Sequence, residues 1–225
     1  MTMDVVIVGA NGQIARLLGE RLVARGDEVR GVVRSAEYAE ALQEAGIQPV
    51  LIDLEADSAE DDLAHASHGA DALVFAAGAG PGSSSERKWT VDYQGAVHTV
   101  TAAGRVDVPR VIVISAMGTD DPPQDDSTFS VYLQAKAKAD VHVRGAGVGH
   151  TIVRPGRLTD DPPTGRVQVG RHVDRGDISR ADVADVLVAV LDNESAAGRT
   201  FEVVAGPARI EDAIPGLADM HDTLD

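Results

Sequence analysis

The stretch from Val5 to Ala15 constrains the fold of this chain more than any other part of the sequence. It begins at residues 5–8 with Val-Val-Ile-Val, four β-branched residues that predict a buried parallel strand. Gly9 then allows a tight turn, and Gly12 allows the backbone to approach a pyrophosphate. Ala15 lets the next helix pack close to the strand, and the free N–H groups at the start of that helix favour an anion. We therefore predict a phosphate-binding turn at the first strand of an α/β sheet.

A Gly-x-x-Gly-x-x-Ala pattern also occurs in plain turns, so its surroundings decide how it is interpreted. A strand precedes it, residues 13–25 have helical periodicity, and Gly26-Asp27 ends that helix before a second strand at residues 28–33. The pattern thus belongs to a strand-turn-helix-strand unit, which favours dinucleotide binding over a plain turn.

The second strand is followed by Arg34 and Ser35. A site specific for NAD usually has an acidic residue there, which binds the hydroxyls of the adenosine ribose. A guanidinium beside a hydroxyl suits a 2′-phosphate instead, because the guanidinium fork binds phosphate oxygens in pairs. We therefore predict NADP as the cofactor rather than NAD. The alternative is a solvated arginine at a strand end.

The length and composition favour one domain. With 225 residues and 44% apolar content, the chain can bury one sizeable core over residues 1–225, with a small substrate-side extension at about 155–225. The absence of cysteine excludes a disulfide scaffold, a thiolate nucleophile and a thiolate metal site. His65 and His68 stand three apart on a predicted helix, but the sequence places no third ligand near them, so no metal site is predicted.

The charge of the chain limits its partners. A formal net charge of −16 repels nucleic acid, so no such partner is expected. No apolar run approaches the length of a membrane span, and the first residues enter the first strand without room for a signal peptide. We expect a cytoplasmic protein with a small-molecule substrate and no membrane contact, present as a monomer or a homodimer.

Strand and helix patterns alternate along the rest of the chain. This alternation implies right-handed crossovers, and it predicts an α/β fold: one doubly wound domain with a mainly parallel central sheet and helices on both faces. The strand order would be 3-2-1-4-5-6, with a crevice between strands 1 and 4. Further strands are predicted at residues 48–52, 72–76, 110–115, 150–154 and 200–204, with one or two short strands within 166–173. Further helices are predicted at residues 36–45, 59–67, 86–105, 131–144 and 180–191, the last capped by Ser179.

Tyr132 and Lys136 stand four residues apart on one predicted helix, so their side chains project from the same face. The lysine ammonium would lower the pKa of the phenol, so that the phenolate could exchange a proton with a substrate hydroxyl while hydride moves to or from a nicotinamide. The same lysine could hold the nicotinamide ribose. Ser115 ends the fifth strand, where its hydroxyl could bind a substrate carbonyl or could instead cap a turn.

These residues together resemble the short-chain dehydrogenase/reductase superfamily, specifically its atypical NmrA-like or epimerase/dehydratase-like branch. The resemblance covers most of the chain. Its segments are 5–15, Val-Val-Arg-Ser at 32–35, Val-Phe-Ala-Ala-Gly at 74–78, Val-Ile-Ser at 113–115, Tyr-Leu-Gln-Ala-Lys at 132–136 and Thr-Ile-Val-Arg-Pro-Gly at 151–156.

The resemblance assigns roles to residues along the predicted crevice. It implies that the glycine turn binds the pyrophosphate, that Arg34 and Ser35 bind the 2′-phosphate, and that Lys136 contacts the cofactor. Asp92 stands where better known members have asparagine, so a carboxylate replaces a proton-relay amide. The remaining cofactor contacts that it implies are Gly9, Asn11, Gly12, Gln13 and Ile14 in the turn, Asp53 and Leu54 beside the adenine, Ala76, Ala77 and Gly78 beside the ribose, and Pro155 near the nicotinamide.

Three functions remain open from the sequence. The favoured one is an NADP(H)-dependent oxidoreductase of a small carbonyl or alcohol, with Tyr132 as the acid or base, Lys136 as its activator and Ser115 as the group that orients the carbonyl. The second is a non-catalytic NADP(H)-binding redox sensor, because many atypical relatives use the fold only to sense nicotinamide. The third is a flavin or quinone reductase, which needs no tyrosine acid. A bulky nucleotide-sugar substrate is not expected, since fewer than 75 residues follow the sixth strand.

Overall fold

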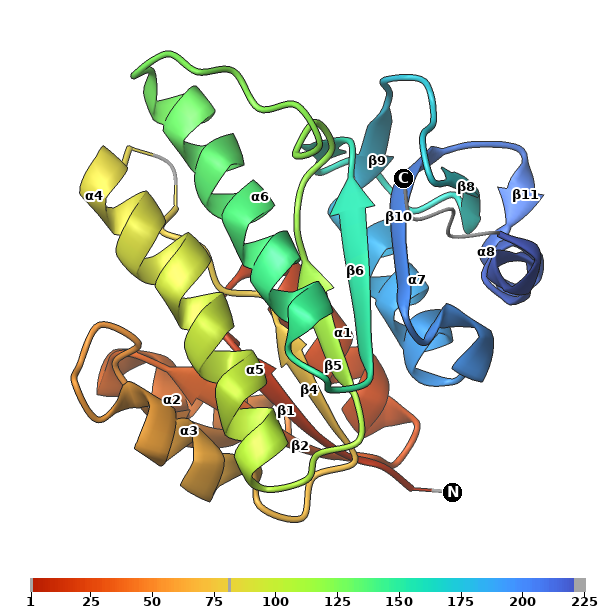
Figure 1. The fold of residues 1–225 in the computed structure, drawn as a ribbon. Coiled ribbons are helices and arrows are strands. Elements are labelled where there is room, and N and C mark those ends of the chain that lie inside the picture. Colours follow the sequence, from red (N-terminus) through yellow and green to blue (C-terminus); the bar gives the residue numbers. More distant parts are fainter. Residues whose placement is uncertain (1, 81, 221–225) are drawn as a thin grey trace.

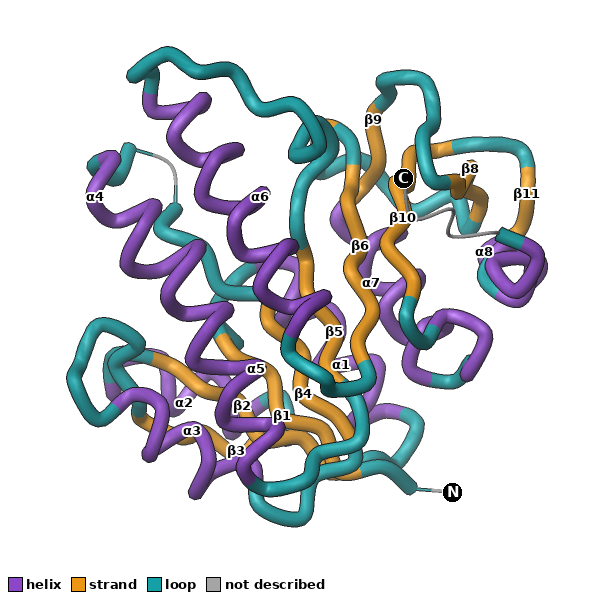
Figure 2. The backbone as a smooth tube through the Cα atoms, viewed as in Figure 1, coloured by secondary structure: helices purple, strands orange, loops and turns teal. Residues whose placement is uncertain are grey.

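The computed structural model describes residues 2–80 and 82–220, which form a central sheet with helices on both faces (Figures 1 and 2). Within those residues, the main sheet has nine strands in the order β11-β8-β10-β6-β5-β4-β1-β2-β3. The part from β6 to β3 is the predicted 3-2-1-4-5-6 order, and all neighbouring strands in it are parallel. The predicted α/β fold with a mainly parallel sheet is therefore confirmed.

The strands of this core are β1 (Asp4–Val8), β2 (Glu28–Val33), β3 (Gln48–Leu51), β4 (Ala72–Phe75), β5 (Val111–Ile114) and β6 (His150–Pro155). The main helices are α1 (Gln13–Ala24), α2 (Ala39–Glu44), α3 (Ala59–Ser67), α5 (Gly95–Arg105), α6 (Thr128–Gly145) and α7 (Arg180–Leu191). Each of these elements except α5 corresponds to one that the sequence predicts, with bounds shifted by a few residues.

The side chains of β1 explain why this strand lies at the centre. All four residues of its apolar run are fully buried. Val5 and Ile7 pack into the core cluster that contains residues of α1, α2 and α7, whereas Val6 and Val8 pack into the cluster that contains residues of α3, α5 and α6. The strand therefore has one helical layer on each face, as a continuous β-branched run requires.

The predicted helix at residues 86–105 is not one regular helix, and this prediction was wrong. The chain forms the short α4 (Ser85–Arg87), a π-helical segment η2 (Lys88–Gln94) and then α5. The wider turn of η2 leaves Lys88, Val91 and Asp92 buried. A π-helical turn inside a longer helix often marks a functional site.

The C-terminal part of the chain extends the sheet beyond β6. β10 (Arg199–Ala205) lies parallel to β6, and β8 (Arg166–Gly170) lies antiparallel to β10. β11 (Ala208–Arg209) forms the edge beside β8, and it is followed by α8 (Ile210–Ala213). β7 (Arg157–Thr159) and β9 (Asp177–Ser179) form a separate two-stranded ribbon. The ribbon and β11 are not predicted from the sequence.

Two short 3-10 helices complete this region, η3 (Glu194–Ala196) and η4 (Pro215–Asp219), while η1 (Ala36–Tyr38) precedes α2. The cap predicted for α7 is confirmed, since the side chain of Ser179 accepts a hydrogen bond from the backbone N–H of Asp182. Over residues 2–80 and 82–220, none of the helices combines the length and apolar character that crossing a bilayer demands.

Candidate functional site

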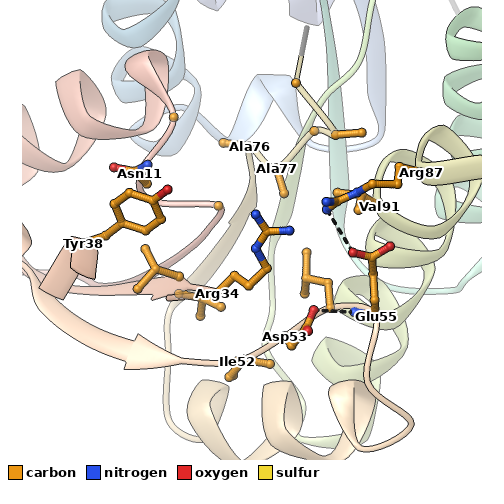
Figure 3. A pocket seen from close by; sticks show the side chains of 18 residues that line it. Asn11, Arg34, Tyr38, Ile52, Asp53, Glu55, Ala76, Ala77, Arg87 and Val91 are labelled. Carbon is orange, nitrogen blue, oxygen red and sulfur yellow. Dashed lines mark hydrogen bonds and ion pairs between the residues drawn. The ribbon is translucent and has the colours of Figure 1, made fainter. Parts of the chain in front are cut away.

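A cavity of about 370 Å³ opens at the carboxyl ends of β1, β2 and β4 (Figure 3). The strand order reverses between β1 and β4, and ligands of doubly wound sheets bind at this point. The cavity contains most of the predicted cofactor residues. Those that line it are Gly9, Asn11, Gly12, Arg34, Asp53, Leu54, Ala76, Ala77 and Gly78.

The turn after β1 lies very close to the start of the loop that follows β4. Gly9 has a φ of +85°, and a Cβ atom there would lie 2.5 Å from the Cα atom of Ala77. The N–H groups of Gly9 and Ala10 both donate to the carbonyl oxygen of Val32, which fixes the turn against β2. The position therefore needs glycine for its backbone angle and for its lack of a side chain.

The turn leaves the first residues of α1 open to the cavity. Gly12 is the N-cap of α1 and supplies no side-chain cap, and both Gly12 and Gln13 are exposed. The side chain of Asn11 is held by Arg16, whose guanidinium donates to its Oδ1 atom. The first N–H groups of a helix carry partial positive charge, so this end of the cavity favours an anion such as a pyrophosphate.

Arg34 lies at the outer end of the cavity, and its guanidinium points into it (Figure 3). Among the described residues it makes neither an ion pair nor a hydrogen bond, so its charge is available to a ligand. Tyr38 lies nearby. A hydrogen bond with Glu37 raises the pKa of the Tyr38 phenol, while the positive charges of Arg34 and Arg16 act in the opposite direction. Two guanidinium groups thus act on this end of the cavity.

Ser35 does not join Arg34 in this cavity. It lies at the start of η1, where its carbonyl oxygen accepts a hydrogen bond from the N–H of Tyr38. Its hydroxyl is not among the groups that line the cavity. Of the two residues predicted to bind the 2′-phosphate, Arg34 lines the cavity and Ser35 does not.

An ion pair lies across the cavity from Arg34, and it could not be predicted from the sequence. The Nη2 atom of Arg87 lies 2.9 Å from Oε2 of Glu55 (Figure 3). Glu55 also accepts a hydrogen bond from the hydroxyl of Thr90. The carboxylate of Asp53 accepts from the N–H of Glu55, so Asp53 shapes its own turn. This pair links η2 and its preceding turn to the loop after β3.

A second cavity of about 200 Å³ continues the first toward α6. The two share Gly12 and residues 76–78, so we describe them together as the crevice. Gln13, Ile14 and three of the predicted catalytic residues line the inner end. These three are Asp92, Tyr132 and Lys136.

Lys136 and Asp92 form a buried pair at this inner end. The Lys136 Nζ atom donates to the carbonyl oxygen of Ile114 at 3.0 Å and lies 3.7 Å from Asp92 Oδ1. The other carboxylate oxygen of Asp92 accepts from the N–H of Ala79. Both side chains are at least 95% buried. Asp92 therefore fixes the position of the lysine and balances its charge.

The expected effect of Lys136 on Tyr132 was wrong for this structure. Burial raises the pKa of the Tyr132 phenol, and the nearby carboxylates of Asp92 and Asp140 raise it further. Lys136 makes no hydrogen bond to Tyr132 among the described residues, because its ammonium is engaged by Asp92 and Ile114. Lys88 lies over the Tyr132 ring instead, with its Nζ atom 5.6 Å from the ring centroid. The phenol is therefore held in its neutral form.

Ser115 is not brought together with Tyr132 on the lining of the crevice. Its buried hydroxyl lies toward Asp140, where it favours the carboxylate form without a well-aligned hydrogen bond. Burial raises the pKa of Asp140, and Arg154, with its Nε atom 2.9 Å from Asp140 Oδ2, opposes that rise. Arg154 also donates to Asp120 at 2.7 Å. Ser115 thus belongs to a buried network behind the crevice.

Pro155 also lies outside the crevice. It lines a separate cavity of about 500 Å³ on the other side of Tyr132, beside Leu133 and Gly156. For a metal, the described residues hold no group of three or more histidine, aspartate or glutamate side chains arranged to bind one.

The comparisons with known proteins agree with this architecture. A family model described as NAD(P)H-binding matches residues 9–194. The uncharacterized sugar epimerase YhfK of Bacillus subtilis is 34% identical over 220 residues, which cover 96% of this chain and 100% of that protein.

Two solved structures extend the comparison. A putative NAD-dependent epimerase/dehydratase from Bacillus halodurans has a TM-score of 0.87 and 37% identity, covering 94% of this chain and 98% of that chain. An oxidoreductase from Lactococcus lactis has the same fold, with a TM-score of 0.83 and 24% identity over 99% of this chain and 100% of that chain. The range of the family model, residues 9–194, includes every residue that lines the crevice.

Proposed function

Because the chain belongs to the NAD(P)H-binding family, whose model matches residues 9–194, we propose that it is an NADP(H)-dependent oxidoreductase of a small carbonyl or alcohol substrate. The resemblance to the epimerase/dehydratase-like class is confirmed by the Bacillus relatives. The observation that carries the proposal is the continuity of the crevice from Arg34 to Tyr132. A dinucleotide extended along it would have its adenosine end near Arg34 and its nicotinamide end near Tyr132.

When bound, the nicotinamide supplies the hydride that reduces a carbonyl carbon. In our proposal, Tyr132 donates its phenolic proton to the carbonyl oxygen, so that the carbonyl becomes an alcohol, and the phenolate then regains a proton from solvent. Since the pKa of Tyr132 is raised, the phenol stays protonated at neutral pH, which is the form that a carbonyl reduction requires. Lys136, held by Asp92, lines the same inner end of the crevice and can bind the nicotinamide ribose there.

The test is a titration of the protein with NADPH and with NADH by calorimetry, followed by single-turnover oxidation of NADPH against aldehydes, ketones, quinones and flavins. Binding of NADPH with oxidation by a carbonyl would support the proposal. NADPH binding of the same affinity, but with no oxidation of NADPH by any acceptor, would favour the redox sensor instead. Oxidation by quinones or flavins alone would favour the third function predicted from the sequence.

The names of the Bacillus relatives raise one more candidate, an epimerase. An epimerase returns the hydride to its own substrate and consumes no cofactor. In the proposed reaction, by contrast, one NADPH is oxidised for each carbonyl reduced. Stereochemical inversion of a sugar without net NADPH oxidation would contradict the proposal.

Replacing Arg34 by alanine is expected to weaken NADPH binding by about ten- to hundredfold, the size of a lost charge-assisted hydrogen bond to phosphate. NADH lacks the 2′-phosphate, so its Kd should change by no more than about twofold in the same variant. Calorimetric titration of both cofactors against wild type and variant measures the two changes. Equal weakening of NADPH and NADH would mean that Arg34 does not recognise the 2′-phosphate.

A further inference from the structure

The cavity that contains Pro155 has a composition unlike that of the crevice. It lies between the start of α6, the end of β6 and the ribbon formed by β7 and β9, and its volume is about 500 Å³. We call it the apolar cavity, because carbon atoms form most of its wall and charged groups are confined to one side. It is lined by Ala116, Met117, Phe129, Leu133, Pro155, Gly156, Arg157, Arg175, Gly176 and Asp177.

The apolar cavity adjoins the reacting end of the crevice. Phe129 lines the cavity and Tyr132 lines the crevice, and the centroids of their rings are 6.2 Å apart. Leu133 and Arg157 line the cavity, while their chain neighbours Tyr132 and Leu158 line the crevice. The two cavities are therefore neighbours, with the rings of Phe129 and Tyr132 at their border.

Phe129 is unusually exposed for an aromatic residue. Its exposed fraction is 65%, although most large apolar side chains of this protein are fully buried. An exposed ring beside a cavity offers a flat surface for stacking with another flat ring. This favours a planar apolar group as the occupant.

The charged side of the apolar cavity carries an excess of positive charge. Arg157 is paired with Asp177 at 2.8 Å, which neutralises both groups. Arg175 has no ion pair or hydrogen bond within residues 2–80 and 82–220, and it is exposed. In a chain with 36 acidic and 20 basic residues, this guanidinium lies at a cavity without a carboxylate partner among the described residues. Arg34, at the proposed phosphate site, likewise has no ion pair or hydrogen bond among the described residues.

We propose that the apolar cavity binds the part of the substrate remote from the reacting carbonyl, and that this part is a flat apolar group bearing a carboxylate or another oxyanion held by Arg175. A guanidinium recognises such oxygens with paired hydrogen bonds. The assignment rests on the proposed function, because it places the carbonyl of the same molecule at Tyr132.

The test compares two probes of the same shape, naphthoate and its uncharged amide naphthamide, in binding to the protein loaded with NADPH. Fluorescence titration measures both Kd values without any turnover. Naphthoate is expected to bind about five- to tenfold more tightly than naphthamide, as an exposed charge-assisted contact would give. In Arg175→Gln this preference should disappear, with naphthamide unaffected.

The matched control is Arg144→Gln. Arg144 is exposed, has no ion pair among the described residues and lines none of the three cavities. This variant should keep the full preference for naphthoate. A second variant, Phe129→Ala, should raise the Kd of both probes by a similar factor of about three to ten, since it removes apolar contact without changing charge.

Two results would overturn the proposal. One is equal binding of naphthoate and naphthamide to the wild type, or tighter binding of a naphthyl ammonium probe. The other is a preference for naphthoate that survives in Arg175→Gln. Because no probe is turned over, the binding result is independent of catalysis. An intact preference in a protein that oxidises no NADPH would therefore reject the reductase and leave the oxyanion site standing.

Discussion

The variant Tyr132→Phe is expected to lower kcat for carbonyl reduction by about 10²- to 10⁴-fold, the usual contribution of a positioned proton donor. The phenol lines the inner end of the crevice, and removing its oxygen removes the proposed proton donor while keeping the ring. The Kd for NADPH should stay within about twofold, because one hydroxyl contributes little to a ligand held mainly by its phosphates. Single-turnover oxidation and calorimetry measure the two quantities separately.

Tyr93→Phe is the matched control for this variant. Tyr93 lies on η2 beside Trp89 and Lys138, and it does not line the crevice. It should therefore retain nearly full activity. A Tyr132→Phe enzyme as active as wild type would reject the proton-donor role, and activity confined to flavins or quinones would then point to a reductase that needs no tyrosine.

The raised pKa of Tyr132 also predicts how the reaction depends on pH. A group whose pKa is raised keeps its proton to higher pH, so the phenol should remain a donor from about pH 6 to 9, below the ordinary tyrosine value. The rate of carbonyl reduction at saturating NADPH should therefore show no loss from phenol ionisation in this range. If this rate instead fell with rising pH, with a midpoint near neutral pH, and the fall were absent in Tyr132→Phe, then Lys136 would lower the pKa of the Tyr132 phenol after all.

Replacing Gly9 by alanine is expected to destabilise the fold by about 2 to 5 kcal/mol, combining the cost of a left-handed backbone with that of overpacking. The new Cβ atom would meet the backbone of Ala77 at 2.5 Å, and neither β1 nor the start of the loop after β4 has room to move in the core. Affinity for NADPH should fall sharply as well, since the turn beside the pyrophosphate would shift. Urea unfolding followed by circular dichroism measures the free energy, provided that the m value is unchanged.

The variant Gly69→Ala separates the free-energy cost of a left-handed backbone from that of overpacking. Gly69 also has a positive φ, of +76°, but a Cβ atom there would meet nothing within 4 Å. Its replacement should cost only about 1 kcal/mol, the backbone part alone, and should leave NADPH binding unchanged. If Gly9→Ala were no more destabilising than Gly69→Ala, the close approach to Ala77 would not be what restricts this position.

The order of the inner strands could be predicted because it depends on local patterns. Buried β-branched runs mark the strands at 5–8 and 111–114, and the helices between them require parallel crossovers. The ribbon of β7 and β9 has three residues in each strand, and four of these six residues are at least partly exposed. Strands this short have no readable alternation, so they depend on partners that only the fold supplies.

The candidate site was predictable to a different extent at each residue. The glycine turn and the pair Tyr132 and Lys136 are local patterns, and the crevice includes them. The raised pKa of Tyr132 was not predictable, because it comes first from burial of the phenol and then from Asp92, which reaches it from another helix. Asp140 is a partial exception, since it stands eight residues after Tyr132 on the same helix and faces the same side. Seven residues are also too few to distinguish a π-helical turn from an α-helical one by periodicity.

The buried network behind the crevice bears on how such a protein can diverge. Arg154 joins α6 through Asp140 to β6, and it holds the loop between β5 and α6 at Asp120. Residues 121–126 of that loop are mostly exposed, and Gln134 of α6 contacts them only at the carbonyl oxygens of Pro123 and Asp125, so their side chains can change without disturbing the helix that carries Tyr132. Arg157, Arg175 and Asp177 of the apolar cavity also lie outside α6 and η2, so mutations there can change which molecule binds while the helix that carries Tyr132 stays as it is. Substrate binding and proton transfer can therefore diverge separately at these positions.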